Sequence, residues 1–126
     1  MAKAVAGSTA AVLGASTKEE RYSFKAVRML KEYGFSPIPV HPAGHTVDGI
    51  DGVKSLTDIS QSIDTLTVYV NAKISAAVLP AVLNLKPRRV IFNPGAENPA
   101  LAQQLADNGI EVVEGCTLVM LRTEQY

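Results

Sequence analysis

The chain alternates short, continuously apolar runs with longer segments in which apolar residues recur at helical spacing. The first run, Thr9 to Leu13, closes abruptly on Gly14, Ala15 and Ser16. A short, uniformly apolar run is typical of a strand that is buried on both faces of a parallel sheet. Four further runs predict strands at residues 35–40, 65–70, 89–92 and 110–113.

The first predicted helix covers residues 24–33. Ser23 is expected to cap its N-terminus, because a serine hydroxyl can accept a hydrogen bond from an unpaired backbone N–H. Gly34 ends the helix, since glycine readily adopts the conformation needed just past a helix C-terminus. The residues expected on its buried face are Ala26, Val27, Leu30 and Tyr33.

A second apolar helix is predicted at residues 72–85. Pro80 lies inside it, lacks an amide donor and clashes with the preceding turn, which predicts a kink or two short helices meeting near Leu79. One broad buried face is expected, made of Ile74, Ala77, Val78, Ala81, Val82 and Leu85.

The third and fourth helices lie near the C-terminus. Asn98 as the N-cap, Pro99 at the first helical position and Gly109 just past the end mark a helix between them. Residues 117–121 predict a short terminal helix that packs on the sheet.

Between the second and third strands, the connection is long and irregular. One short helical turn is expected at residues 53–59, begun by Thr57 or Asp58. Elsewhere strands and helices alternate, which implies an α/β fold with a parallel sheet, right-handed crossovers and helices on both faces. A chain of 126 residues is the size of one domain, so we expect residues 1–126 to form a single domain.

Composition excludes several classes of protein. The formal net charge is zero and the basic residues are scattered, so a nucleic-acid partner is not expected. Cys116 is the only cysteine, which leaves no internal disulfide and no thiol cluster for a metal, and suits the reducing cytoplasm. The apolar N-terminus is alanine-rich and interrupted by Gly7 and Ser8, unlike a secretory signal. No apolar run approaches the roughly 18 residues of a membrane span.

The predicted ligand site lies at the carboxyl ends of the strands, where α/β sheets bind ligands. Gly14 allows a close approach of backbone to a phosphate near a helix N-terminus. A dinucleotide site would add a Gly-x-Gly-x-x-Gly turn and an acidic residue ending the second strand, where His41 stands instead. Nearby cations and histidines suit a phosphorylated ribose better than a free diol, although they can also be ordinary solvated loop charges: Lys18, Arg21, Lys25 and His45.

Five segments resemble the CoA-binding domains that are similar to the N-terminal domain of the succinyl-CoA synthetase α-subunit, especially the small free-standing bacterial and archaeal members. They are residues 12–16 (VLGAS), 22–23 (YS), 39–42 (PVHP), 90–99 (VIFNPGAENP) and 114–121 (EGCTLVML). The last two are the most specific. The resemblance implies a Rossmann-like three-layer α/β fold, with a five-stranded parallel sheet of order 3-2-1-4-5 and helices on both faces.

The resemblance also implies which residues hold CoA. The turn at residues 14–16 would meet the phosphates, His41, Pro42 and His45 would lie near the adenosine end, and Val70 and Asn71 would line the adenine pocket. Many relatives have asparagine in place of His41, so the contact of His41 stays open. The expected CoA-binding residues are Gly14, Ala15, Ser16, Lys18, Arg21, Tyr22, Ser23, His41, Pro42, His45, Val70, Asn71, Asn93, Pro94 and Gly95.

The predicted function is non-catalytic binding of CoA or acyl-CoA. The enzyme in the resembling family owes its chemistry to a further domain with a phosphorylated histidine and to a partner subunit, and such a domain is not expected in this chain. No nucleophile has a base and an orienting group near it, and Cys116, lone in an apolar stretch, is expected to be buried and inert, although a pair with His41 or His45 is conceivable. No catalytic and no metal-binding residue is therefore predicted.

Two other functions stay open. The leading alternative is an NAD(P)-binding or redox-sensing Rossmann domain that acts with a partner. A receiver-like phosphorylation domain would need clustered carboxylates after the first strand and an aspartate ending the third, and neither is present. Neither the acyl group nor the oligomeric state follows from the sequence, so a homodimer and an unknown protein partner both stay open.

Overall fold

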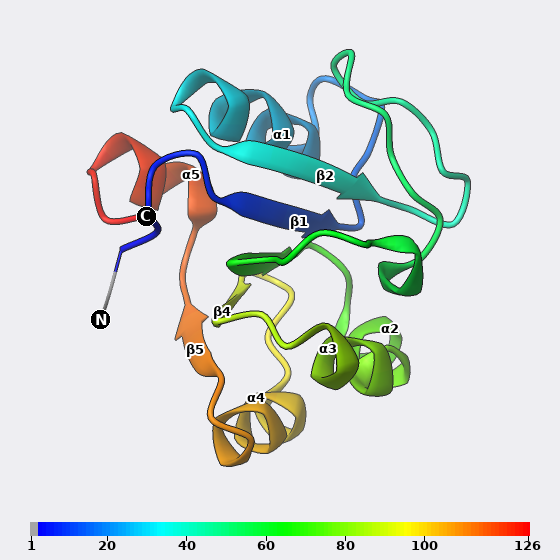
Figure 1. Ribbon diagram of the computed structural model, residues 1–126, viewed down its shortest axis with the longest axis vertical. Coiled ribbons are helices and arrows are strands. Elements are labelled where there is room, and N and C mark those ends of the chain that lie inside the picture. The colour runs from blue at the N-terminus through cyan, green and yellow to red at the C-terminus, as the bar shows by residue number, and fades with distance from the viewer. Residues whose placement is uncertain (1–2) are drawn as a thin grey trace.

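The computed structural model describes residues 3–126. Five parallel strands form one sheet in the spatial order β2-β1-β3-β4-β5 (Figure 1). The α/β Rossmann-like fold class is therefore confirmed. The strands are β1 (Thr9–Leu13), β2 (Ser36–Val40), β3 (Thr65–Val68), β4 (Arg89–Phe92) and β5 (Glu111–Glu114).

The order of the strands differs from the predicted 3-2-1-4-5, because β3 pairs with β1 and does not lie outside β2. The two prolines of β2 give the physical reason. The Pro39 carbonyl accepts the Val53 N–H on the outer side of β2, so the missing amides of Pro37 and Pro39 also face outward. A further strand paired with the outer side of β2 would lack two hydrogen bonds, because neither proline has an N–H to donate. An edge strand tolerates proline on its solvent side.

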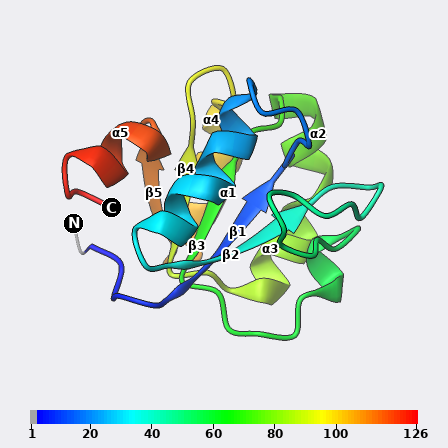
Figure 2. The same cartoon turned by 90° about the horizontal axis from the view of Figure 1, so that it is seen from above.

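Helices cover both faces of the sheet (Figures 1 and 2). Alternate strand residues point to opposite faces, so Ala10 and Val12 join one apolar core and Ala11 and Leu13 join the other. One face carries α1 (Tyr22–Glu32) and α5 (Thr117–Arg122), and the other carries η1 (Leu56–Asp58), α2 (Ala72–Ala77), α3 (Leu79–Leu85) and α4 (Pro99–Asp107).

Helix α1 begins earlier than predicted. Arg21 occupies the N-cap position without a side-chain hydrogen bond, and Ser23 lies inside the first turn. The Ser23 hydroxyl accepts the Ser16 N–H at 3.1 Å, so it supports the turn after β1 and the prediction that it caps α1 is wrong. Tyr33 lies at the C-cap with 47% of its surface exposed, outside the buried face.

The predicted break at Pro80 is confirmed, with α2 and α3 meeting at Val78. The single broad buried face is wrong, because Val82 is the only one of its six predicted members that is fully buried. The break turns α2 so that Ser75 faces inward, where its hydroxyl accepts a hydrogen bond from the Asn98 amide at 2.9 Å. Ile74 is left 49% exposed.

The other helix ends bear out the sequence patterns in part. Asn98 caps α4 by accepting the Leu101 N–H, Pro99 begins the helix and Gly109 follows its end with a positive φ. The turn at η1 is present, but Ser55 caps it, in place of Thr57 or Asp58. None of the helices described between residues 3 and 126 combines the length and the apolar character that crossing a bilayer requires.

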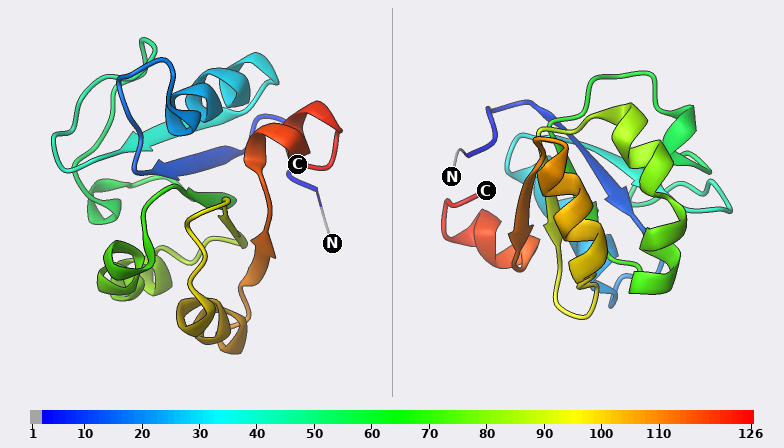
Figure 3. Two further views of the ribbon diagram at one scale, coloured as in Figure 1. Left: turned by 180° about the vertical axis from the view of Figure 1, so that it is seen from behind. Right: turned by 90° about the horizontal axis from the view of Figure 1, so that it is seen from below.

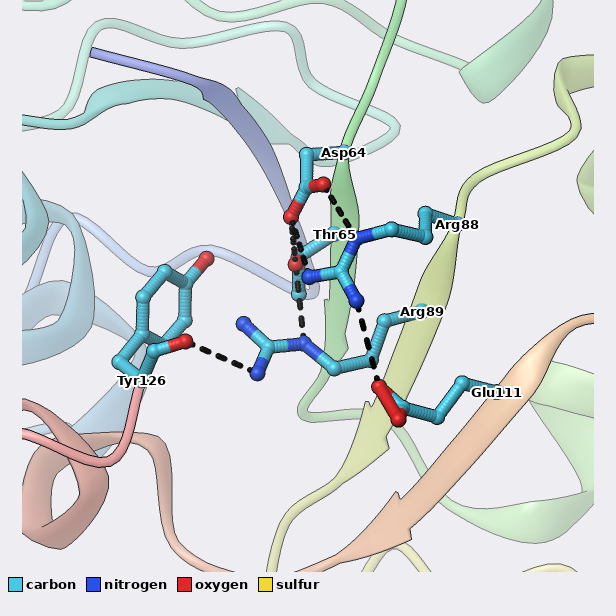
Figure 4. A network of polar contacts seen from close by, with 6 residues as sticks. All are labelled: Asp64, Thr65, Arg88, Arg89, Glu111 and Tyr126. Atoms are coloured by element: carbon cyan, nitrogen blue, oxygen red, sulfur yellow. Dashed lines mark hydrogen bonds and ion pairs between the residues drawn. The ribbon is translucent and has the colours of Figure 1, made fainter. Parts of the chain in front are cut away.

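A polar network closes the amino end of the sheet, on the side of the N- and C-terminal segments (Figures 3 and 4). Arg89 is fully buried, and its Nε and Nη1 donate to the Thr65 hydroxyl at 3.1 Å and the Tyr126 carbonyl at 3.0 Å. Its guanidinium carbon lies 4.5 Å from the Tyr126 ring centroid. The preceding residue, Arg88, forms ion pairs with Asp64 and Glu111. The network therefore fastens the C-terminal residue to β3 and β4.

The Asp64–Arg88 pair predicts a pH-dependent contribution to stability. Burial raises the pKa of Asp64, but hydrogen bonds from Arg88 and Thr65 outweigh burial and leave the pKa below its usual value. A carboxyl group with a lowered folded-state pKa stabilises the fold above its unfolded pKa and loses that contribution as pH falls through the folded value. The stability advantage of wild type over Asp64→Asn is therefore expected to be full at about pH 7 and to shrink below about pH 4. Urea denaturation of both proteins across this range measures it, and an advantage that does not change with pH would contradict the assignment.

Candidate functional site

Two pockets lie at the carboxyl end of β1 and share Gly14. The apolar pocket, of about 290 Å³, is lined by Leu13, Gly14, Val40, His41, Pro42, Lys54, Ser55, Leu56, Val70, Ile74, Val78 and Ala81. The polar pocket, of about 410 Å³, is lined by Gly14, Ser16, Lys18, Arg21, Tyr22, Ser23, Tyr69 and Pro94. One continuous site with an apolar part and a polar part can therefore form across a single glycine.

Gly14 has a backbone conformation and surroundings that exclude a side chain. Its φ is +89°, in the region that favours glycine, and a Cβ there would lie 2.7 Å from Cγ1 of Val70. The amides of Gly14 and Ala15 both donate to the Val40 carbonyl, at 2.9 and 3.2 Å. These two amides are therefore occupied within the turn, which leaves the amides and hydroxyls of the next residues to meet a ligand.

The polar pocket combines two cationic side chains with backbone N–H groups that donate to serine hydroxyls. The side chains of Lys18 and Arg21 are exposed and have no ion pair or hydrogen bond to other residues in the described part of the chain. The Ser16 N–H donates to Ser23, and the Ser16 hydroxyl accepts the Lys18 N–H at 3.0 Å. Neutral hydroxyl contacts of this kind are weaker than charge-assisted hydrogen bonds, so an anion can replace them.

The apolar pocket has aliphatic walls and a polar rim. Leu13 and Val40, the last residues of β1 and β2, line one part of it, and Ile74 of α2, Val78 at the break and Ala81 of α3 line another. The sequence pattern assigned the last three residues to the core, and the break at Val78 places them at a cavity. Sequence reasoning also missed Lys54, Ser55 and Leu56, because no local pattern shows that residue 53 returns to pair with β2.

Two stacked imidazoles connect the loop after β2 to the turn after β1. The His41 and His45 rings lie 4.4 Å apart between centroids, with 23° between their planes. His45 Nε2 donates to the Ala15 carbonyl at 3.2 Å, because a carbonyl oxygen only accepts. The Ala43 N–H donates to His41 Nδ1 at 3.0 Å. The stack therefore ties the loop after β2 to the turn at residues 14–16.

An ion-pair cluster fastens the same loop to α1. Asp48 has a positive φ of 49°, and its carboxylate lies 3.0 Å from both Arg28 Nη2 and Lys31 Nζ. The hydrogen bond from Arg28 and a second one from Lys31 hold the pKa of Asp48 below its usual value. The loop that carries His41 and His45 is therefore held in place on both sides.

Some predicted site residues lie outside both pockets. Ala15 is fully buried, Asn71 caps α2 through the Ile74 N–H, and the Gly95 N–H donates to the Glu97 carboxylate. Asn93 is 2% exposed. Its NH₂ group donates to the Thr67 hydroxyl and the Val68 carbonyl, and its side-chain oxygen accepts the Thr117 N–H. The structure gathers the others at the two pockets: Gly14, Ser16, Lys18, Arg21, Tyr22, Ser23, His41, Pro42, Val70 and Pro94. His45 is joined to them only through Ala15 and His41.

The side chains of Cys116 and Tyr69 differ from the sequence expectation. Cys116, expected to be buried, is partly exposed at the N-cap position of α5. Tyr69, which the sequence analysis did not assign to the site, has a buried hydroxyl with no hydrogen-bond partner in the described chain, and burial raises the pKa of its phenol. Within residues 3–126, no three His, Cys, Asp or Glu side chains gather closely enough to hold a metal ion.

Known proteins share this fold and show the family of the chain. A solved protein described as uncharacterized is 39% identical, with a TM-score of 0.91, and the match covers 97% of this chain and 100% of the other. A protein from Thermus thermophilus is 32% identical, with a TM-score of 0.87, over 95% of this chain and 91% of its own. A dinucleotide-forming acetyl-coenzyme A synthetase 1 from Ca. Korarchaeum cryptofilum shares the fold at 18% identity, with a TM-score of 0.74, over 87% of this chain and 26% of the synthetase. The family model of the CoA binding domain matches residues 8–122, and the chain therefore belongs to the CoA binding domain family.

Proposed function

We propose that this protein binds CoA or an acyl-CoA in the two pockets that meet at Gly14, and that it does so without catalysing a reaction. The observation that carries the proposal is the division of the site into an apolar pocket and a cation-lined pocket across one glycine. CoA has the same division, with a flat aromatic base at one end and a pyrophosphate in the middle. Family membership supports a CoA ligand independently.

The chemistry of each pocket indicates which part of CoA it would hold. The aliphatic walls of the apolar pocket suit the adenine ring, since burying apolar and aromatic surface is favourable. Lys18, Arg21 and the Ser16 N–H suit the pyrophosphate, because charge-assisted hydrogen bonds to phosphate are strong. The pantetheine arm would then leave through the polar pocket, past Tyr22 and Pro94.

The lining residues favour CoA over NAD. Neither pocket is lined by an aspartate or glutamate in the described chain, and His41 occupies the place at the end of β2 where a carboxylate would hold a ribose diol. A phosphorylated ribose meets no repulsion there. The proposed role is that of a carrier, sensor or regulatory subunit, since the residues that line the two pockets are suited to holding a phosphate group and an adenine ring.

A melting experiment tests the proposal. CoA at about a hundred times its dissociation constant should add about 2.7 kcal/mol to the free energy of unfolding. For a domain near this size, that gain corresponds to roughly 5 to 10 °C in melting temperature. NAD should give a much smaller shift. If NAD or NADH raises the melting temperature while CoA and acetyl-CoA leave it unchanged, the CoA proposal is wrong.

A further inference from the structure

We propose that Lys54 recognises the ribose 3′-phosphate and so distinguishes CoA from dephospho-CoA. This inference rests on the proposed function, and it names the residue that sets its ligand specificity. Lys54 is not in any of the sequence motifs discussed above, and it reaches the site only through the fold.

The backbone places Lys54 beside the end of β2. Val53 forms a parallel bridge with Val40, in which the Val53 N–H donates to Pro39 at 2.9 Å and the Val53 carbonyl accepts the His41 N–H at 3.0 Å. The next residue therefore lies beside the carboxyl end of β2, where dinucleotide-binding proteins place the carboxylate that holds the ribose. In this chain, Lys54 therefore brings a cation close to His41, which occupies the position of that carboxylate.

The side chain of Lys54 is available for a ligand. Lys54 is the only lysine or arginine among the described residues that line the apolar pocket. Its side chain forms no hydrogen bond or ion pair with any other residue between positions 3 and 126. Its aliphatic stem lies against the loop after β2, since a Cβ at Gly44 would come within 2.8 Å of Lys54 Cγ. Gly44, with a φ of +63°, leaves room for this stem.

The cations of the site fall into two groups that match the two phosphate positions of CoA. Lys18 and Arg21 line the polar pocket, and Lys54 lines the apolar pocket on the other side of Gly14. With adenine in the apolar pocket, the ribose and its 3′-phosphate lie nearer to Lys54 and His41 than the pyrophosphate does. Lys25, considered for this role from the sequence, instead lies over the Tyr22 ring at 5.5 Å and lines neither pocket.

Calorimetric titration of wild type and Lys54→Met with CoA and with dephospho-CoA tests the assignment. Wild type is expected to bind CoA at least about tenfold more tightly than dephospho-CoA, since hydrogen bonds to charged groups are of that strength. Lys54→Met should lose this preference while binding dephospho-CoA within about twofold of wild type. Lys54→Arg should keep most of the preference, because it keeps the charge.

Two further variants separate the roles of the cations. Lys73→Met, on the exposed side of α2 and outside both pockets, should leave all affinities unchanged. Lys18→Met should weaken both ligands alike. Equal binding of CoA and dephospho-CoA by wild type, or an equal loss of both in Lys54→Met, would overturn the role of Lys54 and leave the proposed function intact. Binding of neither ligand by folded wild type would overturn the proposed function itself.

Discussion

Replacement of Gly14 by valine is expected to abolish CoA binding while the chain still folds. A valine Cβ would lie 2.7 Å from Val70 Cγ1 and 3.4 Å from the Tyr69 carbonyl group, so the side chain would stand between the two pockets and push Val70 into the apolar one. The φ of +89° adds backbone strain of about 1 to 3 kcal/mol. Affinity should fall more than about a hundredfold, since both pockets lose their shared edge. Calorimetric titration at a temperature where circular dichroism shows the variant folded measures this loss.

Gly34→Val is a matched control for that experiment. Gly34 has a φ of +90° but no atom within 4 Å of an added Cβ, and it follows the C-terminus of α1, away from both pockets. The control carries the same backbone strain without the collision, so it should lose stability and keep its affinity for CoA. Full binding by Gly14→Val, or an equal loss in both variants, would show that the turn after β1 has no particular role in holding the ligand.

Replacement of Asn93 by alanine is expected to destabilise the fold by about 3 kcal/mol. The Asn93 side chain is 2% exposed and makes hydrogen bonds to Thr67, Val68 and Thr117 that no other described side chain replaces. Without it, the buried Thr117 N–H at the start of α5 loses its partner, and a buried unsatisfied group costs about 1 to 3 kcal/mol. Urea denaturation gives the change in the free energy of unfolding.

The same variant decides between a structural and a ligand-binding role for Asn93. The sequence placed Asn93 in the CoA site, whereas the structure places its side chain outside both pockets. Affinity for CoA, measured on the folded protein, should therefore change little. Asn108→Ala is a control, because Asn108 makes an exposed hydrogen bond to the Gln104 carbonyl and its loss should cost less than about 1 kcal/mol. A small loss of stability with a large loss of affinity would make Asn93 a ligand contact.

The positions of most elements could be predicted from the sequence, because the signals that mark them are local. Buried parallel strands appear as apolar runs, and the ends of α4 are marked by Asn98, Pro99 and Gly109. The break at Pro80 follows from one residue whose geometry a continuous helix cannot accommodate. These features depend on a few neighbouring residues, and the structure confirms them.

The strand order could not be obtained in the same way from apolar runs, because a run does not indicate its neighbours. The prolines of β2 held the missing information. Pro37 and Pro39 are two residues apart, so their nitrogens face the same side of β2. A strand side that lacks two amide donors is expected at an edge of the sheet. The resemblance to a family pointed to 3-2-1-4-5, and the proline pattern, read as an edge signal, would have argued against it.

The site was predictable where its residues follow a strand directly and not where they arrive through a long connection. Gly14, Ser16, His41 and Val70 end or follow predicted strands, and they line the pockets. Lys54 lies thirteen residues beyond His41, in a segment that pairs with β2 through a bridge at Val53. Such a contact depends on tertiary packing, so the sequence analysis did not identify Lys54 as a residue of the apolar pocket.

Native mass spectrometry of the protein mixed with equal concentrations of CoA and NAD tests the central claim most directly, because each ligand identifies itself by its mass. The pockets that share Gly14 predict one CoA per chain, almost no NAD adduct, and loss of the CoA adduct in Gly14→Val but not in Gly34→Val. A spectrum in which wild type carries NAD in preference to CoA, or in which folded wild type carries neither, would contradict the account.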